Sequence, residues 1–311
     1  MKNSKATPFV SYLVLFLGVI FLSISPLFVR WANAPGVVTS FYRMVVAICV
    51  TGLILLISKR KLVSKKIPGK LWLLPILAGI ASALDHAFWS TAIENTHIAN
   101  ATLLNYIAPL WVGIIAIFLL HEKYSGIFWP GMALVLTGAF AVSGARFTDF
   151  SKVSFAGEGF AIISSFFYAA YFIFSQKARH RFRILPYLFV TSIVSLLVLG
   201  LIIFARGLPI FGYERSTYLV FLTAGLFSQL GGYFCLFYAL GNIPASIVSS
   251  ILVLQPVITS LLAIRLFGEK ISMIQIIGGV FVLGGIYLIN SSKTKIQNLP
   301  VEEPEISGTS N

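Results

Sequence analysis

Apolar runs of about 20 residues recur along the whole chain, and they constrain its fold more than any other feature. A helix needs roughly 20 mostly apolar residues to cross the hydrocarbon core of a bilayer. The alternation of polar and apolar residues that marks a membrane barrel strand is not found in the sequence. We therefore expect an all-α polytopic membrane protein. Its ten transmembrane helices are expected at residues 10–29, 37–58, 71–92, 98–120, 126–145, 155–176, 185–205, 216–240, 244–267 and 272–290.

Composition excludes the soluble classes of protein. The 311 residues are 58% hydrophobic and 11% charged, whereas soluble domains average about 25% charged. The two cysteines, Cys49 and Cys235, lie inside apolar runs, so neither a disulfide framework nor a cysteine metal site is expected. The first run follows Lys2 and Lys5 as in a signal peptide, but it is too long for one, so we expect it to be retained as a span.

The basic residues predict the orientation in the membrane. With the N-terminus inside, 15 of the 23 Lys and Arg residues fall in cytoplasmic segments and 7 in outer ones, while Arg43 lies within a span. We therefore expect both termini in the cytoplasm and the protein in the inner membrane of a bacterium. The net charge of +13 is explained by this topology and by anionic lipid, not by a nucleic-acid partner. Residues 1–9 are expected to form a cytoplasmic N-terminal segment, and the polar cytoplasmic tail 291–311 is expected to be disordered.

An internal repeat appears when the sequence is shifted by 147 residues without a gap. The two copies span residues 10–145 and 155–290, and five spans separate equivalent points, so the copies are inverted in the membrane. Inverted repeats are typical of carriers that alternate access around a site near the midplane. The matching pairs are Ala92 and Ala239, Asn95 and Asn242, Pro109 and Pro256, Glu122 and Glu269, Lys123 and Lys270, Ser125 and Ser272, Gly131 and Gly278, Leu136 and Leu283, and Gly138 and Gly285.

The repeated pattern resembles the EamA repeat of the drug/metabolite transporter superfamily. Each copy has A-x-x-N, a small-residue stretch, a mid-span proline, a glutamate and then G-x(6)-G, in AIENTHIANATLLNYIAPLWVGIIAIFLLHEKYSGIFWPGMALVLTG and ALGNIPASIVSSILVLQPVITSLLAIRLFGEKISMIQIIGGVFVLGG. The resemblance covers nearly the whole chain. It implies a 5+5 inverted-repeat bundle around a central substrate cavity. Members of the family export amino acids or other metabolites, or take up nucleotide-like compounds.

The repeated glycines and prolines have different expected roles. Each copy carries two glycines seven residues apart, which places them on one helix face, and small residues there allow close helix packing. Pro109 and Pro256 lie in the fourth span of each half and are predicted to kink it. The kink either serves packing alone or shapes the cavity and moves during transport. The four glycines are Gly131, Gly138, Gly278 and Gly285.

Ionisable residues within the spans are few, and they give the strongest functional signal. Arg43 and Asp85 share a depth of roughly 10 Å below the outer surface. They form a structural ion pair or a substrate or proton site, or Asp85 meets water in an outer vestibule. Trp89 shares a helix face with Asp85, and His86 lies about 100° around the helix. The repeat places Gly232 opposite Asp85, so the acid is not duplicated.

Further polar residues at similar depth are candidates for the cavity lining, although each can equally serve packing. We expect a secondary carrier for a small polar metabolite, driven by the substrate gradient, an exchanged solute or protons, and acting as a monomer or a homodimer. No cofactor or metal is expected, because motifs for ATP, hydrolytic or metal chemistry are not found. The alternatives are a nucleotide-like uptake carrier, an integral-membrane enzyme with paired acids, and a scaffold without a polar cavity. The additional lining candidates are Asn105, Tyr106, Gln229, Tyr233 and Gln255.

Overall fold

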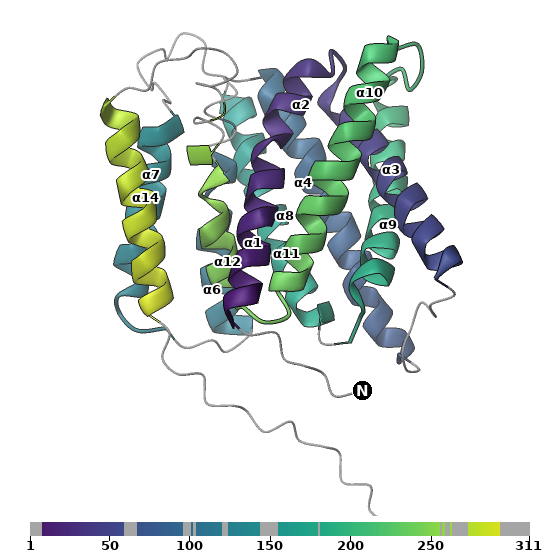
Figure 1. The fold of residues 1–311 in the computed structure, drawn as a ribbon. Helices are drawn as coiled ribbons and strands as arrows, with labels where there is room; N and C mark the ends of the chain where they lie inside the picture. The colour runs from purple at the N-terminus through teal and green to yellow at the C-terminus, as the bar shows by residue number, and fades with distance from the viewer. Residues whose placement is uncertain are drawn as a thin grey trace, which may run out of the picture.

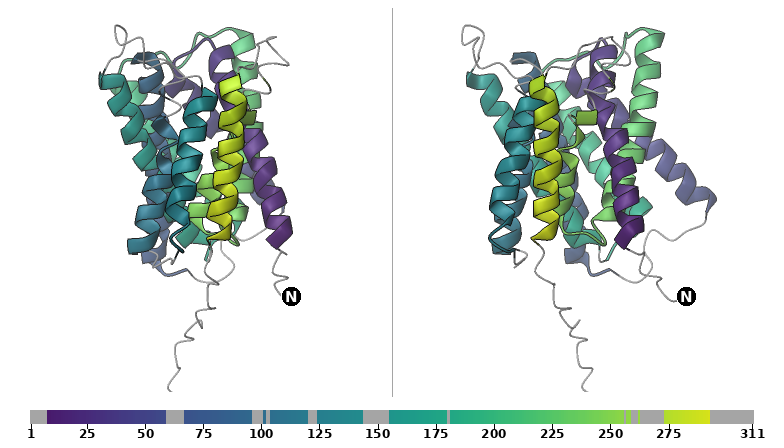
Figure 2. Two further views of the ribbon diagram at one scale, coloured as in Figure 1. Left: turned by 90° about the vertical axis from the view of Figure 1, so that its left-hand side faces the viewer. Right: turned by 60° about the vertical axis from the view of Figure 1, so that its left-hand side comes forward.

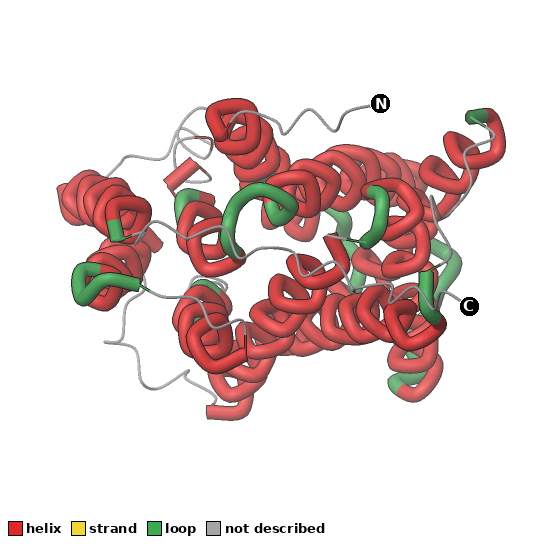
Figure 3. Tube along the Cα trace, turned by 90° about the horizontal axis from the view of Figure 1, so that it is seen from below, coloured by secondary structure: helices red, strands yellow, loops and turns green. Residues whose placement is uncertain are grey.

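The computed structural model describes residues 8–58, 67–95, 101, 104–119, 124–143, 155–179, 181–255, 257–258, 262 and 273–292, and these contain no β-strand. The helices stand side by side with their axes in roughly one direction (Figures 1 and 3). In chain order they are α1 (Pro8–Ser23), α2 (Ser25–Trp31), α3 (Gly36–Ile57), η1 (Gly69–Trp72), α4 (Leu73–Asn95), α6 (Ala108–Leu119), α7 (Phe128–Ser143), α8 (Phe155–Arg179), α9 (Ile184–Ala205), α10 (Arg215–Thr223), η3 (Ala224–Gly232), α11 (Tyr233–Ala239), α12 (Ala245–Leu252) and α14 (Met273–Ser291).

The described helices include six stretches that are long and apolar enough to cross a membrane. Three shorter apolar helices, at 108–118, 128–141 and 276–289, accompany them. The prediction of an all-α polytopic membrane protein is thus confirmed. The expected spans 98–120 and 244–267 are described only in part. The six long stretches are Phe9–Val29, Gly36–Ile57, Gly69–Asn95, Ala156–Arg179, Ile184–Ala205 and Arg215–Ala239.

Two of the long stretches are interrupted along their length. α1 ends at Ser23 and α2 starts at Ser25, with Pro26 in its first turn, where the missing N–H costs no helical hydrogen bond. Between α10 and α11 the chain forms a nine-residue π-helix, η3, a rare conformation that is frequent at functional sites. Pro109 lies in the first turn of α6, directly after a turn at 106–107, so the helix is interrupted there. Pro256 lies outside the described residues.

The packing of the two halves follows the 147-residue offset. The offset relates α1 and α2 to α8, and it relates α4 to η3 and α11. α4 packs along α8, and correspondingly α11 and η3 pack against α1. α3 and α9 are equivalent to each other and are also in contact. Buried side chains of α1, such as Leu15 and Val19, contribute to the main core, so the first apolar run is an integral part of the bundle.

α7 and α14 form a close pair at one edge of the molecule (Figures 1 and 2). A Cβ atom added to Gly138 would lie 2.6 Å from the Gly278 carbonyl oxygen, and one added to Gly285 would lie 2.6 Å from the Gly131 carbonyl oxygen. The four glycines therefore allow the close helix packing that the sequence predicts. The offset converts the contact between Gly131 and Gly285 into the contact between Gly278 and Gly138. A two-fold axis across an antiparallel pair requires this reciprocity.

Several of the repeated positions cannot be compared between the two halves. Glu122, Lys123, Glu269 and Lys270 lie outside the described residues, as does Ser272. The same holds for residues 1–7 and for the tail from residue 293 onward.

Candidate functional site

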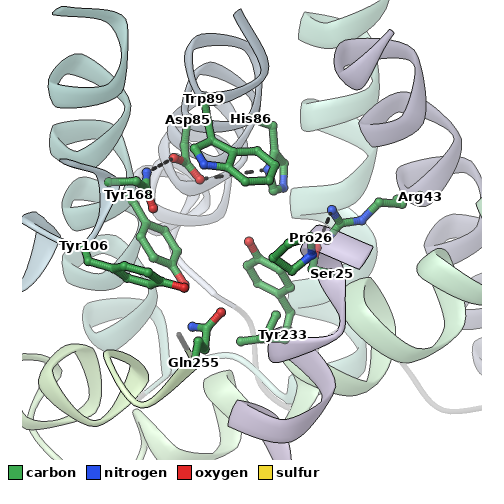
Figure 4. A pocket seen from close by; sticks show the side chains of 12 residues that line it. Ser25, Pro26, Arg43, Asp85, His86, Trp89, Tyr106, Tyr168, Tyr233 and Gln255 are labelled. Carbon is green, nitrogen blue, oxygen red and sulfur yellow. Dashed lines mark hydrogen bonds and ion pairs between the residues drawn. The ribbon is translucent and has the colours of Figure 1, made fainter. Parts of the chain in front are cut away.

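A buried cavity of about 70 Å³ lies between the two halves of the bundle (Figure 4). The cavity is lined by every residue that the sequence predicts for it except Gln229. Gln229 lies behind the lining and accepts a hydrogen bond from Arg43. The lining thus combines one cation, one acid and several aromatic rings from distant parts of the chain. It consists of Leu22, Ser25, Pro26, Arg43, Asp85, His86, Trp89, Asn105, Tyr106, Tyr168, Tyr233 and Gln255.

The carboxylate of Asp85 is fixed on one wall by two neutral donors. Ser164 Oγ donates to Oδ1 at 2.6 Å, and Asn105 Nδ2 donates to the same oxygen at 3.1 Å. Asn105 Nδ2 also lies 2.6 Å from Ser164 Oγ. His86 Nδ1 is 4.0 Å from Oδ2, the other carboxylate oxygen. Asp85 is almost fully buried, so these donors replace the water that the carboxylate loses.

The guanidinium of Arg43 is fixed on the opposite wall by oxygen atoms that carry no charge. Its Nη1 donates to Ser25 Oγ at 3.2 Å, and its Nη2 donates to Ser228 Oγ at 3.1 Å and to Gln229 Oε1 at 3.3 Å. Nε is buried without a hydrogen-bond partner. Ser228 and Gln229 belong to η3, so the π-helix of the second half holds the cation of the first.

Arg43 and Asp85 do not form an ion pair in this structure. Within the part of the chain that the structure describes, the pairs within 4.0 Å are His86 with Asp85 and, at the surface, Arg206 with Glu94. Figure 4 shows Arg43 and Asp85 on separate sides of the cavity. The structural ion pair, one of the alternatives left open by the sequence, is therefore not observed. Each charge instead has its own set of polar neighbours.

His86, Trp89 and Asp85 all line the cavity, although His86 follows Asp85 directly on α4. The ring of His86 meets the ring of Tyr233 edge-on, with centroids 6.3 Å apart. These two residues are equivalent under the 147-residue offset. Two equivalent residues can meet only near the axis that relates the two halves, so the pseudo-two-fold axis passes next to the cavity. His86 Nε2 is buried without a partner in the structure.

A polar stripe on α8 was missed by the sequence analysis. Ser164, Tyr168, Tyr171 and Ser175 recur at intervals of four, three and four residues, so they share one helix face. All four are buried. Ser164 binds Asp85, Tyr168 lines the cavity, and Ser175 Oγ lies 2.5 Å from the Tyr187 hydroxyl oxygen. The spacing of these hydroxyl groups along one helix face was the signal that could have found them.

A second cavity, of about 220 Å³, adjoins the first. The two share Pro26 and Trp89 in their linings. The second cavity extends along α4 to Glu94, which is paired with Arg206 at 2.9 Å on the exposed upper end of the bundle. Trp89 and the start of α2 thus stand between the buried cavity and that surface. No group of three or more residues that could hold a metal occurs among the described residues.

A helical membrane bundle with a polar cavity between two related halves is the arrangement that membrane carriers have. The family model of the EamA-like transporters matches residues 9–144 and 155–291, so the chain belongs to the EamA-like transporter family. An uncharacterized transporter of Clostridium kluyveri is 25% identical, over 93% of this chain and 95% of that protein. The uncharacterized transporter YdfC of Bacillus subtilis is 23% identical over 68% of each chain. A solved crystal structure shares the fold, with a TM-score of 0.75 at 16% identity over 90% of this chain and 97% of the other.

Proposed function

We propose that the protein is a secondary carrier that moves a small zwitterionic metabolite, such as an amino acid, by alternating access. The observation that carries this proposal is the buried cavity with Arg43 and Asp85 on separate walls. A buried charge without a counter-ion is costly. Two opposite charges that face one cavity but do not pair are suited to a ligand that carries both charges itself.

The zwitterion fits the distribution of groups around the cavity. Arg43, held by Ser228 and Gln229, is suited to a carboxylate because guanidinium groups bind carboxylates with directed hydrogen bonds. Asp85 is suited to an ammonium group, and the faces of the nearby aromatic rings add cation–π attraction. The cavity, at about 70 Å³, is far smaller than the roughly 300 Å³ or more of pockets for drug-sized ligands, which favours a small solute over the nucleotide-like alternative.

Alternating access is supported by the arrangement of the halves around the cavity. The six long and three shorter apolar helices, together with α12, fit the ten crossings of a 5+5 inverted repeat. The short helix α2 and Trp89 separate the cavity from the upper surface, so their movement would open it on that side. Coupling to protons would use Asp85 and the adjacent His86, whereas exchange would need no titration of either group.

Transport in proteoliposomes tests the proposal. The purified chain is reconstituted and challenged with labelled amino acids, sugars, nucleosides and organic anions, with and without a pH gradient. Zwitterionic solutes should be transported and should compete with one another, and singly charged analogues should compete poorly. Flux of nucleotides alone, or chemical conversion of a lipid substrate without flux, would contradict the carrier and favour the uptake or enzyme alternatives.

The orientation of the termini is a separate proposal, supported by the 15-to-7 distribution of basic residues. We place the lower end of the bundle in Figure 1, where α1 begins and α14 ends, in the bacterial cytoplasm. Lys70 and Arg215 are exposed at the two ends. In a cysteine-free background, Arg215→Cys should react with an impermeant thiol reagent in intact cells and Lys70→Cys should not. Labelling in the opposite sense would invert the topology.

A further inference from the structure

The largest of the cavities described here, about 560 Å³, lies at the lower end of the bundle, away from the candidate substrate site. It opens where α8 ends and α9 begins, beside the C-terminal part of α3 and the start of α11. Two of the seven residues that line it are arginines, and the described lining includes no carboxylate. The lining residues are Leu55, Arg179, Arg183, Ile184, Leu185, Pro186 and Phe234.

Arg179 is held in the cavity wall by an aromatic ring and by a glycine. Its guanidinium carbon lies 5.7 Å from the centre of the Phe237 ring. A Cβ atom at Gly241 would lie 2.6 Å from Arg179 Nε, so the absence of a side chain at residue 241 makes room for the guanidinium. Nε is nevertheless buried without a hydrogen-bond partner. A guanidinium that is fixed in a cavity wall and forms no ion pair among the described residues is suited to an anionic ligand.

The surroundings indicate that this ligand comes from the bilayer. The C-terminal half of α3 leans away from the bundle next to the cavity (Figures 1 and 2). Its Leu56 and Ile57 are 78% and 74% exposed, as lipid-facing residues are. The five other residues of the cavity lining are apolar. The ligand should therefore combine an anionic group with a hydrocarbon chain, and the lower end is the one that the basic residues predict to face the anionic cytoplasmic leaflet.

We propose that this cavity binds an anionic phospholipid, with the phosphate on Arg179 and Arg183 and an acyl chain against Leu55 and Phe234. Arg179 supplies a guanidinium whose position is fixed by Phe237 and Gly241. Arg183 supplies a second, exposed guanidinium at the rim. The site is independent of the cavity around Asp85 and needs no transport to be observed.

Thermal unfolding of the full chain in mixed micelles tests the proposal. Phosphatidylglycerol should raise the midpoint of unfolding by about 2 °C or more over an equal amount of phosphatidylcholine. Inorganic phosphate at the same concentration should leave the midpoint unchanged. If inorganic phosphate raised the midpoint equally, the ligand would be a free anion and not a lipid. Equal midpoints in the two lipids would contradict an anion-binding site altogether.

Three variants separate this site from a general effect of positive charge. The double change Arg179→Gln with Arg183→Gln should remove the phosphatidylglycerol effect. Gly241→Ala leaves the net charge unaltered but displaces the flexible end of Arg179, so it should reduce the effect by at least half. Arg181→Gln removes one charge from an exposed residue of the same turn that does not line the cavity, and it should retain the effect.

The outcomes remain decisive if the double variant does not fold. Arg183→Gln alone alters an exposed side chain and should weaken the phosphatidylglycerol effect, measured against the same variant's midpoint in phosphatidylcholine. If Arg181→Gln lost the phosphatidylglycerol effect to the same extent, the basic residues would act only through the overall positive charge of this end of the protein. That result would contradict a specific binding site. Retention of the full effect in both Gly241→Ala and Arg183→Gln would do the same.

Discussion

α4 and the chain from η3 through α11 occupy equivalent places in the two repeats, yet they differ in structure and chemistry. α4 is a continuous helix that carries Asp85 and Trp89 into the cavity. Its counterpart is interrupted by a π-helix and has Gly232 at the position of Asp85. It contributes Tyr233 to the lining and, through Ser228 and Gln229, the acceptors for Arg43. The first repeat thus presents both charges, and the second supplies hydrogen-bond partners to each of them, Ser228 and Gln229 to Arg43 and Ser164 to Asp85.

The scaffold is therefore symmetric between the repeats, whereas the site is not. Helix packing depends on backbone shape, which both repeats share, so the close contacts of α7 and α14 occur in reciprocal pairs. A small solute has no two-fold symmetry, so a cavity that recognises it benefits from unlike walls.

The shared scaffold is most sensitive at its paired glycines. Gly138→Val and Gly285→Val should each abolish most of the folded protein, because their Cβ atoms would press on backbone atoms at 2.6 Å, and overpacking of this kind costs about 3 kcal/mol or more. Yield of monodisperse protein in detergent measures the effect. Gly284→Val is the control, since a Cβ atom there meets Leu134 Cδ2 at 3.5 Å. Clearly unequal losses at residues 138 and 285 would argue against equivalent repeats.

The unduplicated acid should matter for transport and not for folding. Asp85→Asn keeps the shape and the hydrogen bonds to Ser164 and Asn105, but it removes the charge. A charged hydrogen bond to the substrate contributes about 1.5–3 kcal/mol, so flux should fall about 10- to 100-fold. Initial rates in proteoliposomes, between about pH 5 and 8, report the loss. Normal yield with unchanged rates across that range would remove Asp85 from the site.

Arg43 and Asp85 are not in direct contact, so each should bind the substrate through its own hydrogen bonds. Arg43→Gln should lower flux by about tenfold or more, through loss of the carboxylate anchor. The double change with Asp85→Asn should be no better folded than the poorer single variant, since a structural ion pair is not observed between them. Yield and unfolding midpoint of the four proteins form a double-mutant cycle. Recovery of yield in the double variant would instead indicate direct pairing in another state.

Residues of unusual chemistry for a membrane span could be identified from the sequence. Arg43 and Asp85 are conspicuous because charges are costly in a bilayer, and the four glycines because they repeat at one offset. The α8 stripe was missed because Ser164 and Tyr168 are each common in packing, and only their shared face is informative. The break before Pro26 and the π-helix η3 could not be predicted, because tertiary contacts decide where a helix changes its hydrogen-bonding pattern.

The smallest effect is expected at the acceptors that the second repeat provides for Arg43. Ser228→Ala and Gln229→Leu each remove one hydrogen bond to the guanidinium. Because these residues act on the substrate only through Arg43, each loss should weaken substrate binding by about 1 kcal/mol, or roughly fivefold in affinity. If these residues position Arg43 for the substrate, the apparent KM should rise while the maximal rate stays near that of the unaltered protein.

Ser82 gives the matched control for this last comparison. It is buried on α4 at the position equivalent to Gln229 but does not line the cavity. Ser82→Ala should therefore leave KM unchanged. If Ser82→Ala raised KM as much as Gln229→Leu does, both walls of the cavity would support the cation. The proposal that the second repeat positions Arg43 would then be wrong. A fall in folded yield with Ser228→Ala, without a change in KM, would reduce the η3 contacts to a structural role.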